Sequence, residues 1–436
     1  MLWVCCFSLG EKENEMAFAT PPHVLGLTCL VCGGNVAYGN VYTCPRCGVE
    51  GILDVQYDYD ACRSLFRTRL SSPPTDHWRY RELMPVPIHQ QVPVLQIGWT
   101  PVYNVPRLAS SLGVRRMLLK DDGRNPTNSF KDRASSVGVL KAEEFGFKTI
   151  ACASTGNAAS SLAGLSAATG LSSMIFVPER APEPKIVQLL VFGATVLKVH
   201  GSYTDAFELC RLACDEFGWY NRNSGTNPFL VEGKKTAGLE IAEQCRERIP
   251  DWVAVSVGDG CTIGAVGKGL QEMKVLGLID HVPRLLGVQA QGAMPVVEAF
   301  RSRANLVPVD ATTIADSIAV GTPRNWRRAI QQVRLSGGDM VAVADEDILD
   351  AMRMTARLGG VFGEPAGVAG IAGVKEAVAR GIIAPDESVL ALITGNGLKD
   401  IHSAKRAVGH TFDVEPDLRS LQKIIAAGHS SGGAPT

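Results

Sequence analysis

The residue best suited to covalent chemistry is a lysine at the start of a predicted helix. Lys131 follows a short apolar strand predicted over residues 117–119 and a loop with glycine and proline, and Ser129 is a favourable N-cap. In the first helical turn, the positive end of the helix dipole disfavours a second positive charge and so favours the neutral amine. A neutral lysine amine can form an imine with an aldehyde. The alternative is a surface lysine paired with Asp132 or Asp122.

Four cysteines have the spacing of a metal site. They form two C-x2-C pairs, each followed by glycine, with eleven residues between the pairs: Cys29, Cys32, Cys44 and Cys47. Four thiolates make a tetrahedral site for zinc that leaves no position open for catalysis. We therefore expect residues 25–57 to form a zinc-ribbon-like module that binds a structural zinc ion. The alternative is that these cysteines have lost their metal.

Three predicted strand ends carry loops that suit a phosphorylated ligand. Ser154, Thr155, Gly156 and Asn157 precede a helix and form either an anion site or an ordinary helix cap. The glycine-rich loop 258–262 favours a monophosphate cradle over a dinucleotide site, because its spacing is not G-x-G-x-x-G. Thr394, at a third strand end, offers a hydroxyl to a ring nitrogen. With Lys131, these loops indicate pyridoxal 5′-phosphate (PLP) as the cofactor.

The elements that must position these residues alternate between strands and helices. Strands are predicted over 149–153, 173–177, 195–199, 252–257, 284–288, 340–343 and 388–393, and helices over 158–169, 203–217, 236–248 and 345–358. This alternation predicts an α/β fold with parallel sheets flanked by helices. Residues 58–100 show few clear elements, although the aromatic and arginine-rich segment 78–85 could pack on the main body. Residues 364–367 are a lesser site candidate and read more readily as a helix start.

Composition limits the class of protein. The chain has 436 residues, 46% of them hydrophobic and 20% charged, with a net charge of -1. This is an ordinary soluble globular protein that acts on a small molecule, without nucleic acid or a membrane as partner. No apolar run is long enough to span a bilayer. The other eight cysteines are scattered, several of them in apolar patterns, which indicates free thiols in the reducing cytoplasm.

The predicted domain organisation has four parts. Residues 1–24 are expected to be a disordered or spurious extension, with Met16 as an alternative start, and residues 25–57 are the ribbon module. Residues 58–415 form the two-domain catalytic body, in which a smaller domain over about 130–220 is inserted in the larger. Residues 416–436 are a C-terminal tail, and the Ser/Gly/Pro-rich end from 428 is expected to be disordered.

The motifs together resemble those of the threonine synthase family, in the tryptophan-synthase-like group of fold type II PLP enzymes. Residues 125–133 look like N-P-T-G-S-F-K-D-R, and residues 154–157 like S-T-G-N. Residues 223–236 resemble N-S-x-N-P-x-R-x-E-G-Q-K-T, and residues 394–399 resemble T-G-H-G-L-K. The resemblance covers about residues 25–405 and implies two parallel-sheet domains of the tryptophan synthase β kind behind the zinc-ribbon-like module.

The resemblance also implies roles. Lys131 forms the internal imine and moves protons, while Phe130 lies against the cofactor ring, Asn157 binds the ring oxygen and Thr394 meets the ring nitrogen. The cofactor phosphate is held by Gly258, Asp259, Gly260, Cys261 and Thr262. The substrate is bound by Ser154, Thr155, Asn223, Ser224 and Lys234. The implied enzyme is a lyase of threonine biosynthesis, expected to be a homodimer, that converts O-phosphohomoserine and water to threonine and phosphate by γ-elimination and β-addition.

Three departures from the family pattern leave the substrate open. Asn128 replaces a glycine, Ala158 replaces a threonine, and Leu230 replaces an arginine that binds the substrate phosphate. The candidates to replace this arginine are Arg222, Lys234 and Arg124. One alternative is a sister enzyme acting at the β carbon, either a cysteate-synthase-like replacement on O-phosphoserine or a threonine or serine dehydratase. Another is a non-catalytic PLP or zinc-ribbon interaction protein, against which the intact Lys131 speaks.

Overall fold

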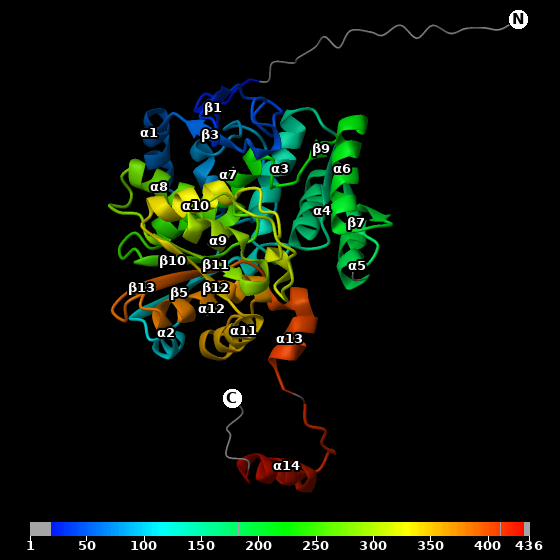
Figure 1. Cartoon of the computed structure of the whole chain (residues 1–436), viewed down its shortest axis with the longest axis vertical. Helices are drawn as coiled ribbons and strands as arrows, with labels where there is room; N and C mark the ends of the chain where they lie inside the picture. The colour runs from blue at the N-terminus through cyan, green and yellow to red at the C-terminus, as the bar shows by residue number, and fades with distance from the viewer. Residues whose placement is uncertain (1–18, 182, 410, 431–436) are drawn as a thin grey trace, which may run out of the picture.

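The strands of the chain form three separate sheets, seen in a computed structural model that describes residues 19–181, 183–409 and 411–430. Six strands form the largest sheet, four strands form a second sheet, and three strands near the N-terminus form a third. Figure 1 shows the N-terminal sheet at the top, above the largest sheet, with the four-stranded sheet and its helices on the right.

The largest sheet has the strand order β12-β11-β10-β13-β5-β4. All neighbours are parallel except β4 and β5. The strands are β4 (Val102–Asn104), β5 (Arg116–Asp121), β10 (Trp252–Ser256), β11 (Arg284–Ala290), β12 (Asp339–Val343) and β13 (Ser388–Ile393). The central residues of β5, β10, β11 and β13 are buried on both faces, as expected when helices cover both sides of a parallel sheet, whereas the edge strand β4 is largely exposed.

Two layers of helices enclose this sheet (Figure 1). One layer comprises α2 (Pro106–Leu112), α11 (Asp345–Gly359) and α12 (Pro365–Ala379). The other comprises α7 (Pro228–Gln244), α8 (Cys261–Val275), α9 (Pro295–Ser302) and α10 (Trp326–Leu335). Alternate strand residues belong to two different hydrophobic clusters, Val253 and Val255 to one and Ala254 to the other. The alternation follows from the period of two in a strand.

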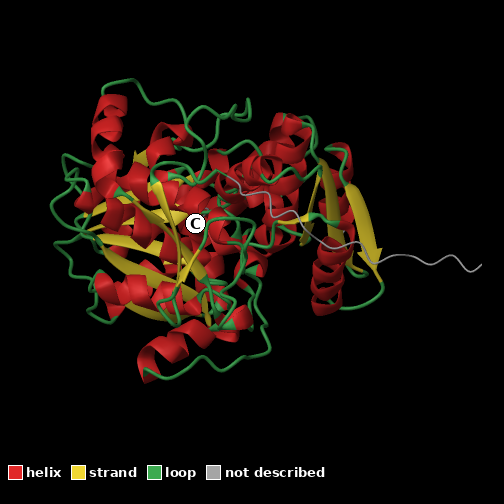
Figure 2. Ribbon diagram, turned by 90° about the horizontal axis from the view of Figure 1, so that it is seen from above, coloured by secondary structure: helices red, strands yellow, loops and turns green. Residues whose placement is uncertain are grey.

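The four-stranded sheet has the order β8-β7-β6-β9 and is wholly parallel. Its elements are α3 (Lys131–Glu144), β6 (Thr149–Ala153), α4 (Asn157–Thr169), β7 (Ser172–Pro178), α5 (Glu183–Val191), β8 (Thr195–Val199), α6 (Tyr203–Phe217) and β9 (Tyr220–Asn221). Seen from above in Figure 2, this sheet lies beside the largest sheet and does not continue it. The strands β6 and β10 therefore end in loops on two different bodies.

The N-terminal sheet carries the four cysteines. It is antiparallel and consists of β1 (Val24–Cys29), β2 (Asn35–Val36) and β3 (Leu53–Tyr57); we call residues 24–57 the ribbon module. The extension expected over residues 1–24 needs correction at its end, because His23 is buried and its Nε2 lies 2.7 Å from the carbonyl oxygen of Met84. Residues 1–18 lie outside the described part of the chain.

All eight strands predicted from 117 onward are present: three have the predicted bounds, four are one to three residues longer, and the one predicted over 252–257 is one residue shorter. One helix was predicted with the wrong start. The helix expected over 236–248 is α7, which begins at Pro228 because Asn227 caps it, its Oδ1 accepting from the Phe229 N–H at 3.1 Å. Residues 58–100 also contain a helix, α1 (Tyr59–Leu70), and a 3-10 segment, η2 (His77–Leu83). The prediction that segment 78–85 packs on the body is confirmed by the ion pair of Arg79 with Glu243 at 2.7 Å.

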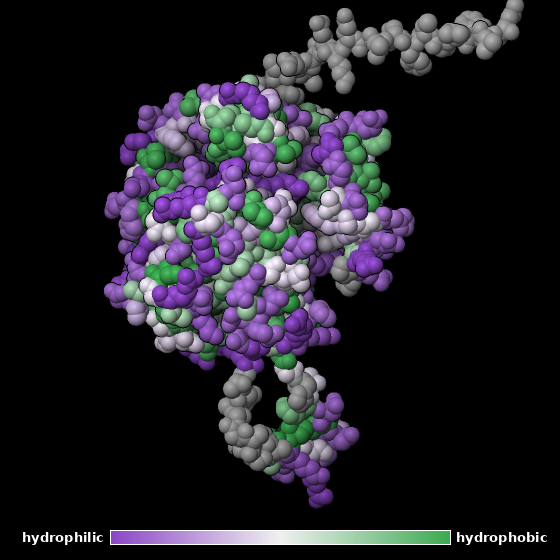
Figure 3. Space-filling view, viewed as in Figure 1, coloured by the Kyte–Doolittle hydropathy of each residue, from purple (hydrophilic) through white to green (hydrophobic). Residues whose placement is uncertain are grey.

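The C-terminal elements are η6 (Gly397–Asp400), α13 (Ile401–Ala407) and α14 (Leu418–Ser430). Figure 3 shows α14 standing apart from the body with a hydrophobic side that includes Leu421 and Ile425. Of the segment expected to be disordered, residues 428–430 are the end of α14 and 431–436 lie outside the description. None of the helices in the described part combines the length and apolar character of a membrane span. The boundaries of the predicted domains stay predictions.

Helices α7 and α8 cross at van der Waals distance. A Cβ atom added at Gly238 would lie 2.3 Å from the carbonyl oxygen of Val266, and one added at Gly269 would lie 2.4 Å from that of Lys235. Only glycine allows this contact. This crossing helps to position the site. Lys234 lies on α7, and the glycine-rich loop leads into the start of α8.

We expect Gly238→Ala to lower the free energy of unfolding by about 1–3 kcal/mol, because a methyl group cannot fit without separating the two helices. Urea unfolding followed by circular dichroism measures the change. Gly409→Ala is the control, since a Cβ atom there meets nothing within 4 Å. Equal stability of the two variants would contradict the close crossing.

Candidate active site

The loop that carries Lys131 is held by its own helix. After β5, the chain forms a 3-10 turn, η3 (Asp122–Arg124), and α3 begins at Lys131. The Asp132 carboxylate accepts from the Thr127 N–H at 2.7 Å and from its hydroxyl at 2.5 Å. The N-cap residue of α3 is Phe130 and not the predicted Ser129, although Ser129 Oγ accepts from the Lys131 N–H at 3.4 Å.

A fully buried cluster of charges anchors the same loop. Arg133 makes paired contacts to Asp122 (Nε–Oδ2 2.5 Å) and to Glu240 on α7 (Nη1–Oε1 2.5 Å). Lys120 at the end of β5 also reaches Glu240, at 2.7 Å. Burial alone would raise the pKa of Glu240, but Arg133 and Lys120 hold it well below its usual range. The turn η3 before Lys131 and the first turn of α3 after it are thereby fixed to the largest sheet and to α7.

The loop after β13 pairs directly with the lysine loop. Phe130 donates its N–H to the carbonyl oxygen of Thr394 at 2.9 Å, and Asn396 donates its N–H to that of Asn128 at 3.1 Å. Asn128 has φ 64°, a left-handed conformation that glycine and asparagine adopt most readily. The glycine expected at this position is therefore replaced by the residue that best tolerates the same backbone.

A cavity of about 800 Å³ opens at Lys131. It lies between the carboxyl ends of β6 and β10. The structure brings thirteen of the fourteen residues predicted for the cofactor and substrate to its walls: Lys131, Ser154, Thr155, Asn157, Asn223, Ser224, Lys234, Gly258, Asp259, Gly260, Cys261, Thr262 and Thr394. Phe130 is the exception. Its ring is fully buried below the loop, 5.8 Å from the Arg133 guanidinium, and does not line the cavity.

Lys131 lies in an environment that favours its neutral form. Burial lowers its pKa to about 8, and the nearby cations Lys234 and Arg222 contribute, whereas Glu364 acts in the opposite direction. The sequence predicted a lowered pKa from the helix dipole. The structure attributes the shift to desolvation and to neighbouring cations. A lysine with this pKa is partly deprotonated near neutral pH and can act both as nucleophile and as base.

Two cations are buried in the cavity wall, where Lys234 contacts the Cys261 thiol and is attracted by Asp259. Arg222 is 1% exposed and donates to the Ser135 hydroxyl at 2.9 Å, and Lys234 is 2% exposed. Neither forms an ion pair with any carboxylate in the described residues. Burial lowers the pKa of both groups. Because buried charges are normally paired, this wall is built to receive an anion.

Of the three residues proposed to replace the missing arginine, only Arg222 and Lys234 reach the cavity. Arg124 is exposed on η3 and lies outside it. Leu230 is fully buried and packs against Gly138. A Cβ atom added at Gly138 would lie 2.8 Å from the Leu230 Cδ2 atom. Lys234 lies one helical turn beyond Leu230 on α7. The resemblance places a glutamine there, so the positive charge has moved by four residues along one helix face.

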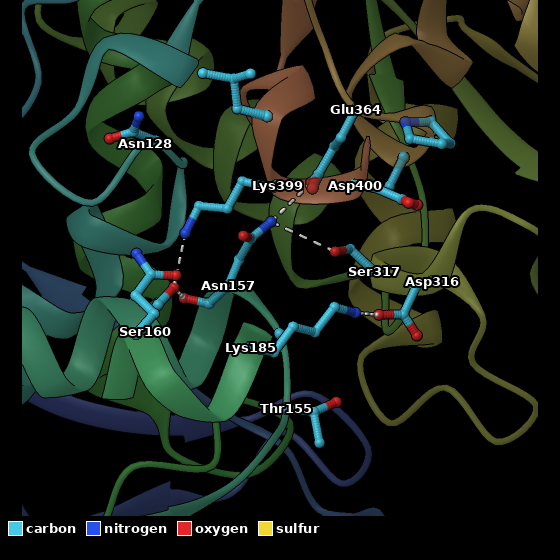
Figure 4. A pocket seen from close by; sticks show the side chains of 15 residues that line it. Asn128, Thr155, Asn157, Ser160, Lys185, Asp316, Ser317, Glu364, Lys399 and Asp400 are labelled. Atoms are coloured by element: carbon cyan, nitrogen blue, oxygen red, sulfur yellow. Dashed lines mark hydrogen bonds and ion pairs between the residues drawn. The ribbon is translucent and has the colours of Figure 1, made fainter. Parts of the chain in front are cut away.

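The loop 154–157 faces a second hollow of about 330 Å³, shown in Figure 4, which shares Thr155, Asn157 and Glu364 with the large cavity. The Asn157 amide donates to Glu364 Oε1 at 2.7 Å. Sequence reasoning treated Glu364 as a helix start, and it is the N-cap residue of α12. It is also a cavity residue, buried, with its pKa raised by that burial. Nothing local in the sequence distinguishes the two roles.

Two lysines cross this second hollow (Figure 4). Lys399, from the large body, donates to the Ser160 hydroxyl on α4 at 2.9 Å. Lys185 on α5 pairs with Asp316 of the large body at 2.6 Å. The side chain of Asn128 lies at the same hollow. The two parallel-sheet bodies are thus joined across the opening by polar contacts.

The glycine-rich loop connects β10 to α8 in the manner of an anion site. Gly260 has φ 90°, and a Cβ atom there would lie 2.7 Å from the carbonyl oxygen of Asn325. The 15-residue helix α8 starts at Cys261, so its first N–H groups point towards the cavity. Just before the loop, the buried Ser256 hydroxyl lines the cavity without a hydrogen-bond partner in the described residues. Ser256 is a site residue that the sequence did not single out.

These features fit PLP. The cavity volume lies within the range of about 300–1,000 Å³ that is usual for ligand sites. Lys131 would supply the amine for the aldehyde, the loop 258–262 would hold the phosphate, and the hydroxyls of Thr394 and Ser256 would offer polar contacts to the ring.

The four cysteines of the ribbon module converge. Their sulfur atoms all lie within 4.8 Å of one another, and Cys29 and Cys44 are buried: Cys29, Cys32, Cys44 and Cys47. This arrangement can hold one zinc ion with four thiolate ligands. The cluster lies in the ribbon module, and none of its cysteines lines the cavity at Lys131.

Comparison with known proteins agrees with the cofactor. Residues 94–395 match the model of the family described as pyridoxal-phosphate dependent enzyme. The chain is 39% identical over 402 residues to a protein named threonine synthase from Methanocaldococcus jannaschii, covering 91% of this chain and 98% of the relative. It is 40% identical over 404 residues to the protein of the same name from Methanosarcina acetivorans, covering 92% and 98%.

Solved structures share the fold. The processed form of threonine deaminase isoform 2 from Solanum lycopersicum has a TM-score of 0.63 at 21% identity, covering 81% of this chain and 95% of that one. Maize serine racemase has a TM-score of 0.62 at 19% identity, covering 86% and 98%. The α/β fold with parallel-sheet domains, of the tryptophan synthase β-like kind, is thus confirmed.

The pKa of Lys131 makes a prediction. If only the neutral amine attacks the aldehyde, the rate of covalent attachment of PLP to the apoprotein should rise with pH and reach half its maximum near pH 8, since this is the pKa given by burial. An exposed lysine would reach half-maximum near pH 10.4. Stopped-flow absorbance over pH 6–11 measures the rate. A midpoint above about pH 10 would contradict the buried, cation-flanked lysine.

Proposed function

We propose that the chain, which belongs to the family of pyridoxal-phosphate-dependent enzymes, is a threonine synthase that converts O-phosphohomoserine and water to threonine and phosphate. The proposal is carried by the relatives of this name, of which the chain covers 98% at 39–40% identity. The site adds that its wall contains two buried cations next to the reactive lysine. Such a wall suits a substrate that carries a phosphate group.

We propose that the cofactor is held by residues of four segments. Lys131 binds it covalently, and Asn157 and Thr394 provide polar contacts to its ring. The loop 258–262 provides backbone N–H groups to its phosphate. When bound, PLP withdraws electrons and stabilises negative charge at the substrate α carbon. A neutral hydroxyl at Thr394, unlike a carboxylate, would not force the ring nitrogen to be protonated, which suits elimination better than transamination.

Lys131 is proposed to move the protons of the reaction. Once the substrate amine has displaced Lys131, the freed lysine amine removes the proton at the α carbon of the substrate and then one at the β carbon. Phosphate leaves from the γ carbon, and water then adds at the β carbon. An amine with pKa about 8 both accepts and returns protons near neutral pH. Together with burial, Lys234 and Arg222 keep the pKa of Lys131 low. They therefore favour the proton transfers without donating or accepting the protons themselves.

The substrate is proposed to lie between the loop 154–157 and the cations. Ser154 and Thr155 offer hydroxyls and a helix N-terminus to the substrate carboxylate. Arg222 and Lys234, with Asn223 and Ser224 beside them, would bind the phosphate that leaves. Asn223 is itself held in place, since its Oδ1 accepts from the Ala153 N–H at 3.3 Å.

We also propose a homodimer in the cytoplasm. The ten cysteines in the described part of the chain are free thiols, which fits a reducing compartment. The molar mass from light scattering tests the dimer.

The proposed reaction predicts that purified protein with PLP releases phosphate from O-phosphohomoserine and forms threonine in equal amounts. A phosphate assay and amino-acid chromatography measure both products. The competing activities are tested in parallel with O-phosphoserine plus sulfite, and with threonine or serine alone. Sulfite-dependent phosphate release, or 2-oxobutyrate from threonine, without threonine formation would replace the proposal with a β-carbon enzyme.

The proposed phosphate contact predicts that Lys234→Gln raises KM for O-phosphohomoserine by roughly tenfold, because a charged hydrogen bond to the phosphate is lost. Inhibition by inorganic phosphate should weaken by a similar factor, whereas the absorbance of bound cofactor should not change. Lys375→Gln is the control, since Lys375 is half exposed on α12. If the affinity for PLP falls and KM for O-phosphohomoserine stays the same, Lys234 binds the cofactor phosphate and not the substrate phosphate.

A further inference from the structure

The ribbon module is attached to the catalytic body through buried charges. Asp54 on β3 pairs with Arg328 of α10 and with Lys268 of α8, the latter at 3.0 Å. Burial alone would raise the pKa of Asp54, but these two cations hold it well below its usual range. The carbonyl oxygen of Leu53 also accepts from Arg328 Nη2 at 2.7 Å. Two consecutive residues of the module, Leu53 and Asp54, therefore bind the same arginine of the body.

Leu53 and Asp54 lie next to the cysteines expected to bind the metal. In the β1–β3 ladder, Cys29 is the direct partner of Leu53. The Cys44 N–H donates to the carbonyl oxygen of Gly51 at 2.8 Å, two residues before Leu53. The position of β3 thus depends on one ligand from each cysteine pair. Because a four-thiolate site with zinc fixes its ligands rigidly, metal binding would fix β3 as well.

On its other side, Arg328 leads to the glycine-rich loop. Its Nε donates to Asn325 Oδ1 at 3.3 Å. Asn325 then donates its backbone N–H to the carbonyl oxygen of Asp259 at 2.9 Å and its amide to that of Gly225 at 2.9 Å. Arg328 and Asn325 are 3% and 1% exposed, so no solvent interrupts this connection. The loop proposed to hold the cofactor phosphate is therefore supported from behind by Asn325 and Arg328.

We propose that Asp54 and Arg328 are positioning residues that connect the four-cysteine cluster to the loop 258–262, so that an occupied metal site strengthens binding of PLP. The residues behind a binding loop set its geometry, and losing one loosens the loop without removing a contact to the ligand. The proposal rests on the cofactor and not on the substrate, so it stands or falls independently of the threonine synthase reaction.

The test is a PLP titration of the apoprotein of the full chain, read by the absorbance of the lysine-bound cofactor, with zinc content measured alongside. Asp54→Asn should retain its zinc and weaken PLP binding by roughly tenfold, since a charged contact to Arg328 is lost. Removing zinc from the unmutated protein with a chelator should weaken PLP binding to a similar extent. Removing zinc from Asp54→Asn should add little further, because both changes act through Arg328.

A matched variant separates this role from general loss of stability. Tyr38→Phe removes other contacts of the same module: its hydroxyl lies 2.6 Å from Glu144 Oε1 at the far end of α3 and also contacts Lys141 and the Pro85 carbonyl oxygen, and none of these contacts leads to the loop. It should leave PLP affinity unchanged, and circular dichroism with the thermal midpoint monitors the fold of each variant. Unchanged PLP affinity in Asp54→Asn, or equal weakening in Tyr38→Phe, would overturn the proposal.

Discussion

The buried guanidinium of Arg133 is the constraint on which the site depends. It binds Asp122 before the lysine loop and Glu240 on α7, and all three side chains are fully buried. Removing one partner of such a pair typically costs about 3–5 kcal/mol, because the other charge remains in the interior. The cluster therefore cannot rearrange without unfolding its surroundings. Lys131, two residues before Arg133, takes its position from this cluster, and so does the loop from Asn128 to Phe130 that pairs with residues 394–396.

Most of the framework could be predicted from the sequence because most strands of the parallel sheets are largely apolar runs; the short strands β4 and β9, which lack such a run, were not predicted. The position of the site followed from the rule that ligands collect at the carboxyl ends of such strands. The start of α7 was missed, although Asn227 before Pro228 is a local signal of a helix start. Tertiary packing explains the glycine further along the helix: Gly233 lies against the Arg133 carbonyl oxygen, which a Cβ atom would approach to 2.0 Å.

The residues that sequence reasoning missed share a physical cause. Ser256 was not singled out at all, whereas Glu364 and Arg222 were only lesser candidates. Each of the three looks ordinary in its own stretch of sequence and became important only when distant segments were brought together. Phe130 was expected against the cofactor ring from a motif; its side chain is fully buried and does not line the cavity, and its contact with the cofactor stays a prediction. A side chain's direction depends on the dihedral angles of the loop, which the motif does not contain. The departure at Asn128, in contrast, is explained once its left-handed backbone is known.

The polar contacts across the second hollow have a kinetic consequence. Lys399 with Ser160, and Lys185 with Asp316, join the two bodies by groups that water solvates well when they separate. Exposed charged pairs contribute only about 0–1 kcal/mol each. Parting the bodies at this opening would break these two contacts and the buried hydrogen bond from the Asn157 amide to Glu364 Oε1, all of them polar. Opening of the cavity for product release would then depend on contacts that water can replace, and it would leave unchanged the buried charge cluster that keeps Lys131 in place.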